Sequence, residues 1–237
     1  MKAWIGGPAR SDRLMRIGIL GGTFDPVHLG HLILAENGRE QGRLDRVWFI
    51  PAAAPPHKLE RPITPFERRV EMLRLAIVGN PAFEVNELEK DRPGPSYTVD
   101  TLTELRRRHP GDEFFLLIGS DTLADLAMWR EPRRIVQMAD LLVWPRPGHP
   151  LRTAEQLRAA LGLPESVAVR LQVVEGPLID ISSTDLRRRA ALGRTLRYLV
   201  PRAVEQYILE KRLYRDVDPP RAEHPAAHSP PADEEEP

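Results

Sequence analysis

The feature that most constrains the fold is the alternation of short apolar runs with stretches of helical periodicity. Several of these runs are apolar throughout, as strands covered on both faces are. Parallel neighbouring strands need long crossovers, so the alternation predicts an α/β fold with a single doubly wound parallel sheet and helices on both faces. The expected strands are Ile17–Leu20, Val47–Ile50, Phe83–Val85, Phe114–Ile118, Leu141–Val143 and Val169–Val174.

Helical patterns fill the intervals between these strands. One runs from about Pro65 to Val78, with Thr64 expected as its N-cap and Glu67 completing a capping box. The other expected helices are Leu29–Glu40, Val99–Arg108, Asp121–Leu126, Pro132–Met138, Ala154–Leu161, Ser183–Leu192 and Pro201–Lys211.

The two ends of the chain lack this alternation. Residues 1–14 have no periodicity, and we expect a poorly ordered N-terminal extension there. Residues 216–237 are rich in Pro, Ala and Glu and too poor in apolar groups to offset the entropy of ordering, so we expect a disordered tail. Residues 15–215 are then expected to form one domain, a usual length for a single core.

Composition excludes several classes of protein. The 34 acidic and 34 basic residues cancel, so no broad attraction to nucleic acid is expected. The chain has no cysteine, which removes disulfide scaffolds, thiolate nucleophiles and thiolate metal sites. No apolar run approaches the roughly 20 residues that span a bilayer, and no secretion signal is evident. We expect a cytoplasmic protein without nucleic-acid or membrane partners; whether it forms a homo-oligomer stays open.

The segment after the first strand is the strongest candidate for a ligand site, since ligands of such sheets bind beyond the carboxyl ends of the strands. It reads GGTFDPVHLGHL over residues 21–32. Gly21 and Gly22 let backbone N–H groups approach a ligand, and the helix that opens near Gly30 has an N-terminus that attracts anions. The segment therefore has the character of a phosphate cradle.

His28 and His31 are three residues apart, so one turn of chain can aim both imidazoles at one point. Each can donate a hydrogen bond to a phosphate oxygen and carry positive charge when charge builds up there. The alternatives are two structural histidines or a metal pair, but a metal pair needs further ligands at a matching spacing, which the sequence does not offer. A phosphate site without protein metal ligands is the better interpretation.

This stretch resembles the signature of the nucleotidyltransferase superfamily, in which an H-x-G-H element meets the phosphates of a nucleoside triphosphate. It lacks the glycine spacing of the dinucleotide fingerprint and the Gly-Lys-Ser/Thr ending of the P-loop. The second signature of the superfamily is expected near the C-terminus, and ISSTDLR occurs at residues 181–187. The resemblance implies a Rossmann-like fold.

Physically, this second motif predicts a helix whose N-terminus is available to an anion. Ser182 and Asp185 have capping-box spacing, Ser183 and Thr184 add hydroxyls, and Arg187 lies one turn in, able to fork onto phosphate oxygens. An ordinary capped helix with a solvated arginine face is the alternative when the motif is taken alone.

The middle of the chain resembles the nicotinate-nucleotide adenylyltransferases in the kind and order of its motifs. These are PPHK at 55–58, PSYT at 95–98, GSD at 119–121, Trp129 and RPG at 146–148, within a match that covers roughly residues 16–215. The resemblance implies transfer of AMP from ATP to nicotinate mononucleotide, giving nicotinate adenine dinucleotide and pyrophosphate in NAD biosynthesis. It assigns His28, His31 and Arg187 to catalysis, Gly21, Gly22, Thr23, Gly119, Asp121, Ser183 and Thr184 to ATP, and Phe24, Lys58, Tyr97, Thr98, Trp129 and Arg146 to the acceptor.

The chemistry of the acceptor residues agrees with this assignment. Trp129 and Tyr97 could stack on a pyridine ring. Thr98 at a helix start could bind the nicotinate carboxylate, with charge from Arg146, while Lys58 suits the mononucleotide phosphate. Each residue also has a plainer structural role as an alternative. Tyr97 and Trp129 could be core or surface aromatics, Thr98 and Asp121 could cap helices, and Lys58 could be a solvated loop lysine.

The implied mechanism is in-line attack by the acceptor phosphate on the α-phosphorus of ATP. That phosphate is already ionised near neutral pH, so neither a general base nor a covalent enzyme intermediate is needed, and catalysis consists of positioning and charge neutralisation. Mg²⁺ is expected to be carried mainly by the ATP phosphates.

Three other functions stay open. The first is a related transferase with nicotinamide mononucleotide or pantetheine phosphate as acceptor, and physics alone does not rank nicotinate above nicotinamide. The second is a non-catalytic nucleotide-binding regulator. The third is RNA binding through residues 106–108 and 187–189, both triple arginines, although balanced charge and helical spacing favour solvated faces.

Deleting Asp216–Pro237 is expected to leave the rate of dinucleotide formation almost unchanged, because the tail carries none of the assigned residues. Assays of purified full-length and truncated protein at equal concentration check this expectation. An inactive truncation would show that the tail is wrongly assigned.

Overall fold

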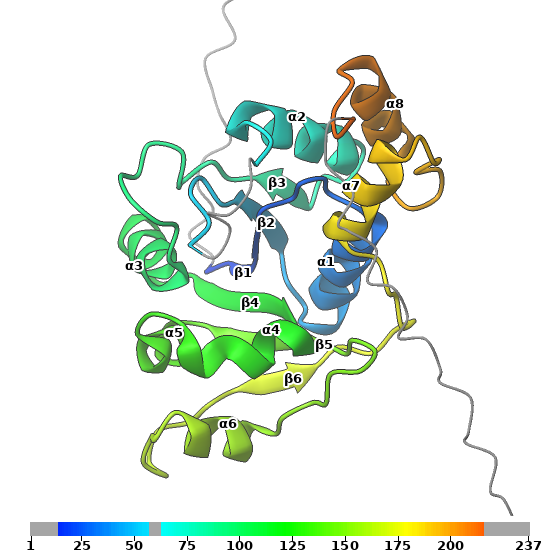
Figure 1. The fold of residues 1–237 in the computed structure, drawn as a ribbon. Coiled ribbons are helices and arrows are strands. Elements are labelled where there is room, and N and C mark those ends of the chain that lie inside the picture. The colour runs from blue at the N-terminus through cyan, green and yellow to red at the C-terminus, as the bar shows by residue number, and fades with distance from the viewer. Residues whose placement is uncertain (1–13, 57–62, 216–237) are drawn as a thin grey trace, which may run out of the picture.

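The strands and helices follow the predicted alternation. The computed structural model describes residues 14–56 and 63–215. Its strands form one sheet in the order β3-β2-β1-β4-β5-β6, and every neighbouring pair is parallel (Figure 1). The strands are β1 (Arg16–Gly22), β2 (Arg46–Pro51), β3 (Phe83–Val85), β4 (Glu113–Gly119), β5 (Asp140–Trp144) and β6 (Leu171–Val173). This is the strand order of Rossmann-like folds, and it reverses between β1 and β4.

All of the predicted helices are present, with small differences at their ends. They are α1 (Leu29–Gln41), α2 (Phe66–Ile77), α3 (Thr98–Arg108), α4 (Ser120–Asp125) with the short 3₁₀ helix η1 (Leu126–Met128), α5 (Pro132–Met138), α6 (Ala154–Ala160), α7 (Ser183–Ala191) and α8 (Arg202–Glu210). The last strand, β6, is shorter than the predicted Val169–Val174.

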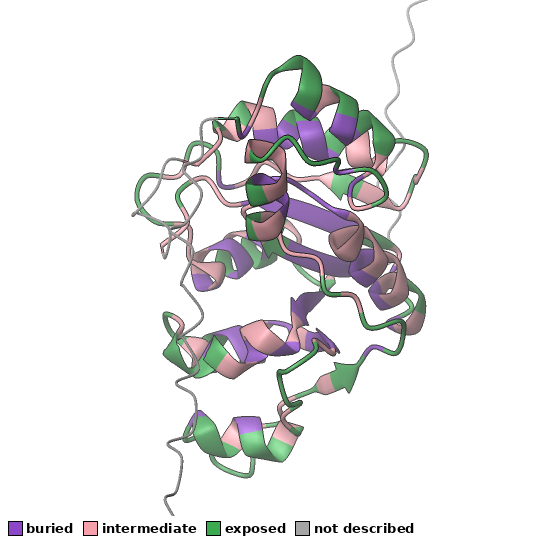
Figure 2. Cartoon of the chain, turned by 45° about the vertical axis from the view of Figure 1, so that its right-hand side comes forward, coloured by how far each residue is buried: buried purple, intermediate pink, exposed green. Residues whose placement is uncertain are grey.

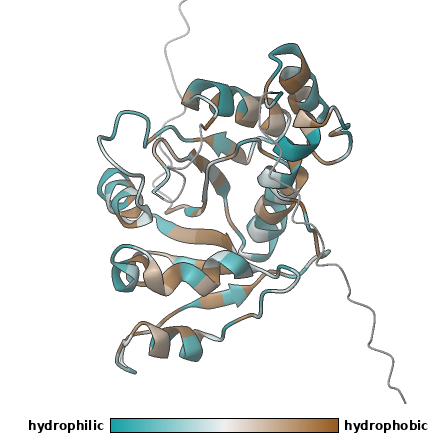
Figure 3. Cartoon of the chain, viewed as in Figure 1, coloured by the Kyte–Doolittle hydropathy of each residue, from teal (hydrophilic) through white to brown (hydrophobic). Residues whose placement is uncertain are grey.

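Successive residues of each strand pack into two separate apolar clusters, one on each face of the sheet. In β4, Phe115 and Leu117 belong to the cluster under α1, α2, α7 and α8. Leu116 and Ile118 belong to the cluster under α3, α4, α5 and α6. Both faces are therefore covered, which explains why the four inner strands β2, β1, β4 and β5 are largely apolar and buried (Figures 2 and 3).

The start of α2 corrects one prediction. Thr64 is not its N-cap: Pro65 is, and no side chain caps the helix. The Thr64 carbonyl accepts a hydrogen bond from Arg69 Nε at 2.9 Å, and its N–H donates to Asp25 Oδ2 at 3.4 Å. Thr64 is thus bonded to the loop after β1, and the predicted capping box with Glu67 is wrong.

The predicted N-terminal extension and C-terminal tail lie almost entirely outside the described residues. These include only Leu14 of the extension and none of residues 216–237. Within the described ranges, no helix combines the length and the apolar character that a membrane span requires.

Candidate active site

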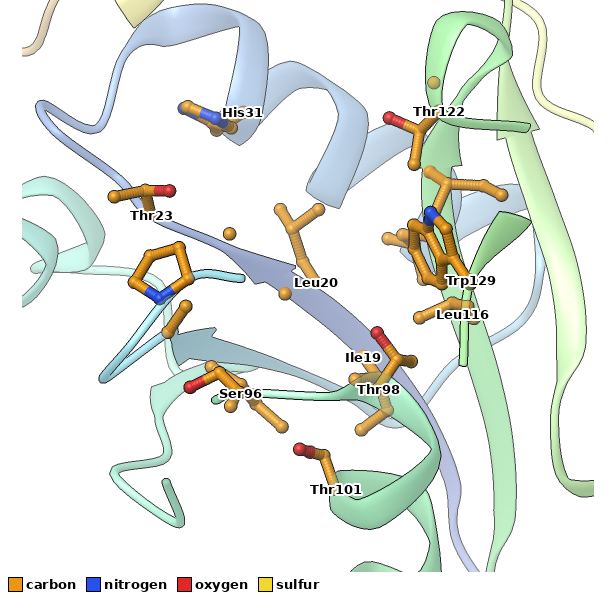
Figure 4. Close-up of a pocket in the computed structure, with 18 of the residues that line it drawn as sticks. Ile19, Leu20, Thr23, His31, Ser96, Thr98, Thr101, Leu116, Thr122 and Trp129 are labelled. Atoms are coloured by element: carbon orange, nitrogen blue, oxygen red, sulfur yellow. The ribbon is translucent and has the colours of Figure 1, made fainter. Parts of the chain in front are cut away.

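A cavity of about 490 Å³ opens at the carboxyl ends of the central strands, where the strand order reverses. Figure 4 shows Thr23 and His31 on one side of it and Trp129 on the other. Residues from the loops after β1, β2, β4 and β5 and from the start of α3 line it, among them Gly21, Gly22, Thr23, His28, Gly30, His31, Ser96, Tyr97, Thr98, Gly119, Asp121, Trp129, Arg130, Trp144 and Arg146. Most of the predicted site residues therefore share one cavity.

The two histidines are brought together at the start of α1. His28 is the N-cap of this helix, and its N–H donates to His31 Nδ1 at 3.2 Å. The two rings stack with centroids 3.7 Å apart. Because Nδ1 of His31 accepts a hydrogen bond, the proton of the neutral ring belongs on Nε2, which can donate to a ligand. A Cβ on Gly30 would lie 3.0 Å from His28 Nδ1, which explains the glycine between the histidines.

His28 is held neutral in the free protein. Burial, and then the positive charge of Arg146, lower the pKa of His28 from 6.5 to about 3. Its Nδ1 is buried without a hydrogen-bond partner among the described residues. Such an atom is usual only where a ligand or water completes the site. In the unliganded state the nearby cation is therefore Arg146, and the charge expected on His28 when phosphate charge builds up stays a prediction.

The second motif packs directly against the first. Ser183 Oγ donates to the Pro26 carbonyl at 2.9 Å, and Arg187 Nη1 donates to the Asp25 carbonyl at 2.5 Å. Arg187 Nη2 also donates to Thr184 Oγ1 at 3.0 Å. The partners in the first two bonds are 157 and 162 residues apart in sequence. The two motifs therefore form one structure.

The cap of α7 is half of the predicted capping box. Ser182 Oγ accepts from the Asp185 N–H at 3.1 Å, as expected. The Asp185 carboxylate, however, accepts from Arg188 Nη2 at 2.6 Å. The charge of Arg188 competes for the carboxylate that would otherwise turn back to the N-cap N–H.

Four predicted ligand contacts do not line the cavity. Arg187, Ser183 and Thr184 make the contacts just described, and Arg187 is only 4% exposed. The buried ring of Phe24 meets His31 edge-on at 5.0 Å. In this structure these residues support the loop that carries the histidines, and their direct contact with substrate stays a prediction.

Three of the predicted acceptor residues, Tyr97, Thr98 and Trp129, line the cavity, and Figure 4 shows Thr98 and Trp129 across it from His31. The N-cap of α3 is Tyr97, and no side chain caps this helix, so Thr98 is not the simple cap that was its alternative role. The guanidinium of Arg130, which sequence reasoning missed, lies 4.8 Å from the Tyr97 ring centroid. Lys58 is outside the described residues.

Arg146 joins the two sides of the site. Its Nη1 donates to the carbonyls of Ile179 and Ile181 at 3.2 and 3.4 Å, just before α7. Its Nε lies 3.7 Å from Asp121 Oδ2. Asp121 Oδ1 is buried with no partner in the described part of the chain, and a Cβ on Gly119 would collide with it. Arg146 and Asp121 therefore place a charge pair at the cavity wall.

Sequence reasoning missed two further residues of the cavity lining, Glu89 and Ser96. Glu89 lines the cavity and accepts from Thr101 Oγ1 at 2.5 Å. Ser96 Oγ accepts from the N–H groups of Ala53 and Ala54, which fixes the loop after β2 to the start of α3. Ser96 lies within the PSYT motif and Glu89 precedes it, but only the three-dimensional structure shows what they contact.

Comparison with known proteins identifies relatives of the whole domain. The family model for cytidylyltransferase-like proteins matches residues 19–189. A "Probable nicotinate-nucleotide adenylyltransferase" of Thermomicrobium roseum is 48% identical over 205 residues, which cover 86% of this chain and 94% of that protein. A protein of the same description from Thermus thermophilus is 49% identical over 201 residues, which cover 85% of this chain and all (100%) of the other.

Solved structures share the fold. Plasmodium falciparum nicotinic acid mononucleotide adenylyltransferase complexed with NaAD superimposes with a TM-score of 0.70 at 19% identity, covering 84% of this chain and 97% of that one. The same enzyme complexed with APC gives a TM-score of 0.68, with the same identity and coverage.

The lowered pKa of His28 predicts a specific pH dependence of stability. The folded-state pKa of about 3 lies below the unfolded value of 6.5, so the unfolded chain binds the proton first as pH falls. The free energy of unfolding should therefore decrease below pH 6.5, by about 2 kcal/mol between pH 7 and pH 5 from this group. In His28→Asn this component should vanish. Urea unfolding of both proteins at the two pH values measures it, and equal losses in both would contradict the assignment.

Proposed function

The chain belongs to the cytidylyltransferase-like family and, within it, to the nicotinate-nucleotide adenylyltransferases, and from that premise we propose how its site works. The protein transfers AMP from ATP to nicotinate mononucleotide, releasing nicotinate adenine dinucleotide and pyrophosphate, a step of NAD biosynthesis. One observation supports this most strongly: the histidine loop, Tyr97 and Trp129 line a single cavity, in which Figure 4 shows Trp129 across from His31.

The histidine side of the cavity suits the triphosphate. Backbone N–H groups near Gly21 and Gly22, the N-terminus of α1 and Nε2 of His31 offer donors to phosphate oxygens. His28 enters as a neutral imidazole, and the negative charge of bound phosphate then favours its protonation. Bound phosphate therefore raises the pKa of His28 above its value in the free protein.

The opposite side suits a pyridine ring that carries a carboxylate. Trp129 and Tyr97 provide aromatic surfaces. Thr98 is the first residue of α3, an 11-residue helix whose N-terminal dipole favours an anion over a neutral amide. This observation supports nicotinate over nicotinamide as the acceptor base, with Arg146 adding positive charge nearby.

The reaction requires little covalent chemistry from the protein. An oxygen of the acceptor phosphate bonds to the α-phosphorus of ATP as the bond from that phosphorus to the β-bridging oxygen breaks, and pyrophosphate leaves. The nucleophile is already ionised at neutral pH, so the side chains hold the two substrates in line and neutralise the charge that develops on the leaving group.

We propose that Mg²⁺ is bound mainly through the substrate. Among the described residues, no group of three or more His, Asp or Glu side chains is arranged to hold a metal ion. Mg²⁺ commonly keeps several waters and binds through substrate phosphates with few protein ligands, which fits this donor set. When bound, it would add charge neutralisation on the triphosphate.

The acceptor is tested by incubating the protein with ATP and nicotinate mononucleotide, nicotinamide mononucleotide, pantetheine phosphate or no acceptor, with pyrophosphate release as readout. The highest kcat/KM is expected with nicotinate mononucleotide. Preference for pantetheine phosphate would replace the proposed substrate, and ATP binding without pyrophosphate release from any acceptor would favour a regulator.

His31→Ala should reduce kcat about 100-fold or more, because it removes a donor aimed at the developing charge. His109→Ala is the matched control, since His109 lies at the C-cap of α3 and does not line the cavity. Thermal unfolding should show both variants folded at the assay temperature. A near-normal rate in folded His31→Ala would remove the phosphate role assigned to this residue.

A further inference from the structure

The loop that carries the histidines is held from behind by side chains from three distant elements. Arg69 Nη1, in α2, donates to the Thr23 carbonyl at 2.8 Å. Arg187 Nη1, in α7, donates to the Asp25 carbonyl at 2.5 Å. Tyr214, which follows α8, donates its hydroxyl proton to Asp25 Oδ1 at 2.8 Å. These contacts leave the opposite side of the loop open to the cavity.

Two of these contacts, those from Arg187 and Tyr214, end on Asp25. It is only 4% exposed, and its Oδ2 accepts from the Thr64 N–H at a long 3.4 Å. The shorter bond to its carboxylate is therefore the one from Tyr214. A buried carboxylate that loses such a donor becomes under-solvated, and the backbone that carries it must adjust.

A shift of Asp25 would reach the catalytic histidines through its neighbours. The preceding residue, Phe24, supports the His31 ring edge-on at 5.0 Å. The following residue, Pro26, accepts from Ser183 and is two positions before His28. The bond between Tyr214 and Asp25 thus acts at the centre of the histidine loop.

The chemistry of Tyr214 suits a permanent donor. Burial, and then the negative charge of Asp25, raise the pKa of its phenol above the ordinary value, so the hydroxyl keeps its proton throughout the physiological range. Its ring lies in the same apolar cluster as Phe24 and Met72, and the Met72 sulfur is 3.9 Å from the hydroxyl. The ring anchors the C-terminal segment, while the hydroxyl orients Asp25.

We propose that Tyr214 is a positioning residue: through Asp25 its hydroxyl fixes residues 23–28 in the geometry in which His28 and His31 meet the phosphates. This inference rests on the proposed function for its kinetic readout. It makes the segment after α8 part of the active-site architecture, although that segment does not line the cavity.

The test removes only the hydroxyl. Tyr214→Phe keeps the buried ring and should lower kcat/KM for ATP about tenfold, the factor expected for one hydrogen bond to a charged group. KM for nicotinate mononucleotide should stay within about twofold, because the acceptor side does not depend on this bond. A purely structural role would lower the unfolding temperature without this split between the two substrates.

Tyr207→Phe is the matched control. Tyr207 lies in α8, and its hydroxyl bonds to Arg68 and Glu71 of α2, away from the loop. Its loss removes a phenolic hydrogen bond from the same C-terminal region and should leave both kinetic constants unchanged. If wild type and Tyr214→Phe have equal kinetic constants, the proposal is overturned, whatever the difference between their unfolding temperatures.

A double-mutant cycle with Asp25→Asn tests whether the Tyr214 hydroxyl acts through the Asp25 carboxylate. If the hydroxyl acts through the carboxylate, Tyr214→Phe should add little further loss in the Asp25→Asn background, whereas additive losses would overturn the route. Should Tyr214→Phe not fold, Asp25→Asn alone decides, since full activity in that variant would overturn the proposal.

A different result would show that the proposed function, rather than the positioning role of Tyr214, is wrong. Wild type that binds a non-hydrolysable ATP analogue but forms no dinucleotide would contradict the function. The positioning role would then be decided by the affinity for the analogue, which should be about tenfold weaker in Tyr214→Phe and unchanged in Tyr207→Phe. Equal affinity in wild type and Tyr214→Phe would overturn it.

Discussion

The site depends on the contact between the loop after β1 and the start of α7. Two hydrogen bonds make it, from Ser183 to the Pro26 carbonyl and from Arg187 to the Asp25 carbonyl. The parallel sheet brings the segments near each other, and these bonds then fix the loop that presents His28 and His31. Because both acceptors are backbone carbonyls, the contact sets the path of the chain as well as the position of a side chain.

The electrostatics of the site keep His28 uncharged in the free protein. A permanently protonated His28 in this buried position would destabilise the free protein, and burial with Arg146 nearby keeps it neutral. In the proposed function, the fixed attraction for phosphate comes from backbone N–H groups and helix N-termini. Pre-oriented groups of this kind need little reorganisation during the reaction, which is how positioning can accelerate transfer of AMP to an already ionised nucleophile.

Local pattern predicted the elements of this fold well, because strands buried on both faces and helices with a regular apolar spacing leave short-range signals. The same reasoning found the histidine loop, whereas Tyr97, Thr98 and Trp129 were assigned through the resemblance to the nicotinate-nucleotide adenylyltransferases. It wrongly assigned Thr64 to a cap, since nothing local reveals that this residue is bonded to Asp25. The bond from Arg187 to the Asp25 carbonyl is likewise absent from the local pattern, while the assignment of Arg187 to phosphate stays a prediction. Contacts such as Tyr214 to Asp25, 189 residues apart, depend on the assembled tertiary structure.

A crystal structure with a non-hydrolysable ATP analogue and nicotinate mononucleotide tests the central claim most directly. We predict the triphosphate against His28, His31 and the backbone near Gly22, with the pyridine ring beside Trp129 and the loop still bonded to α7. A triphosphate bound away from the histidines, or a loop detached from α7 in the complex, would contradict this account.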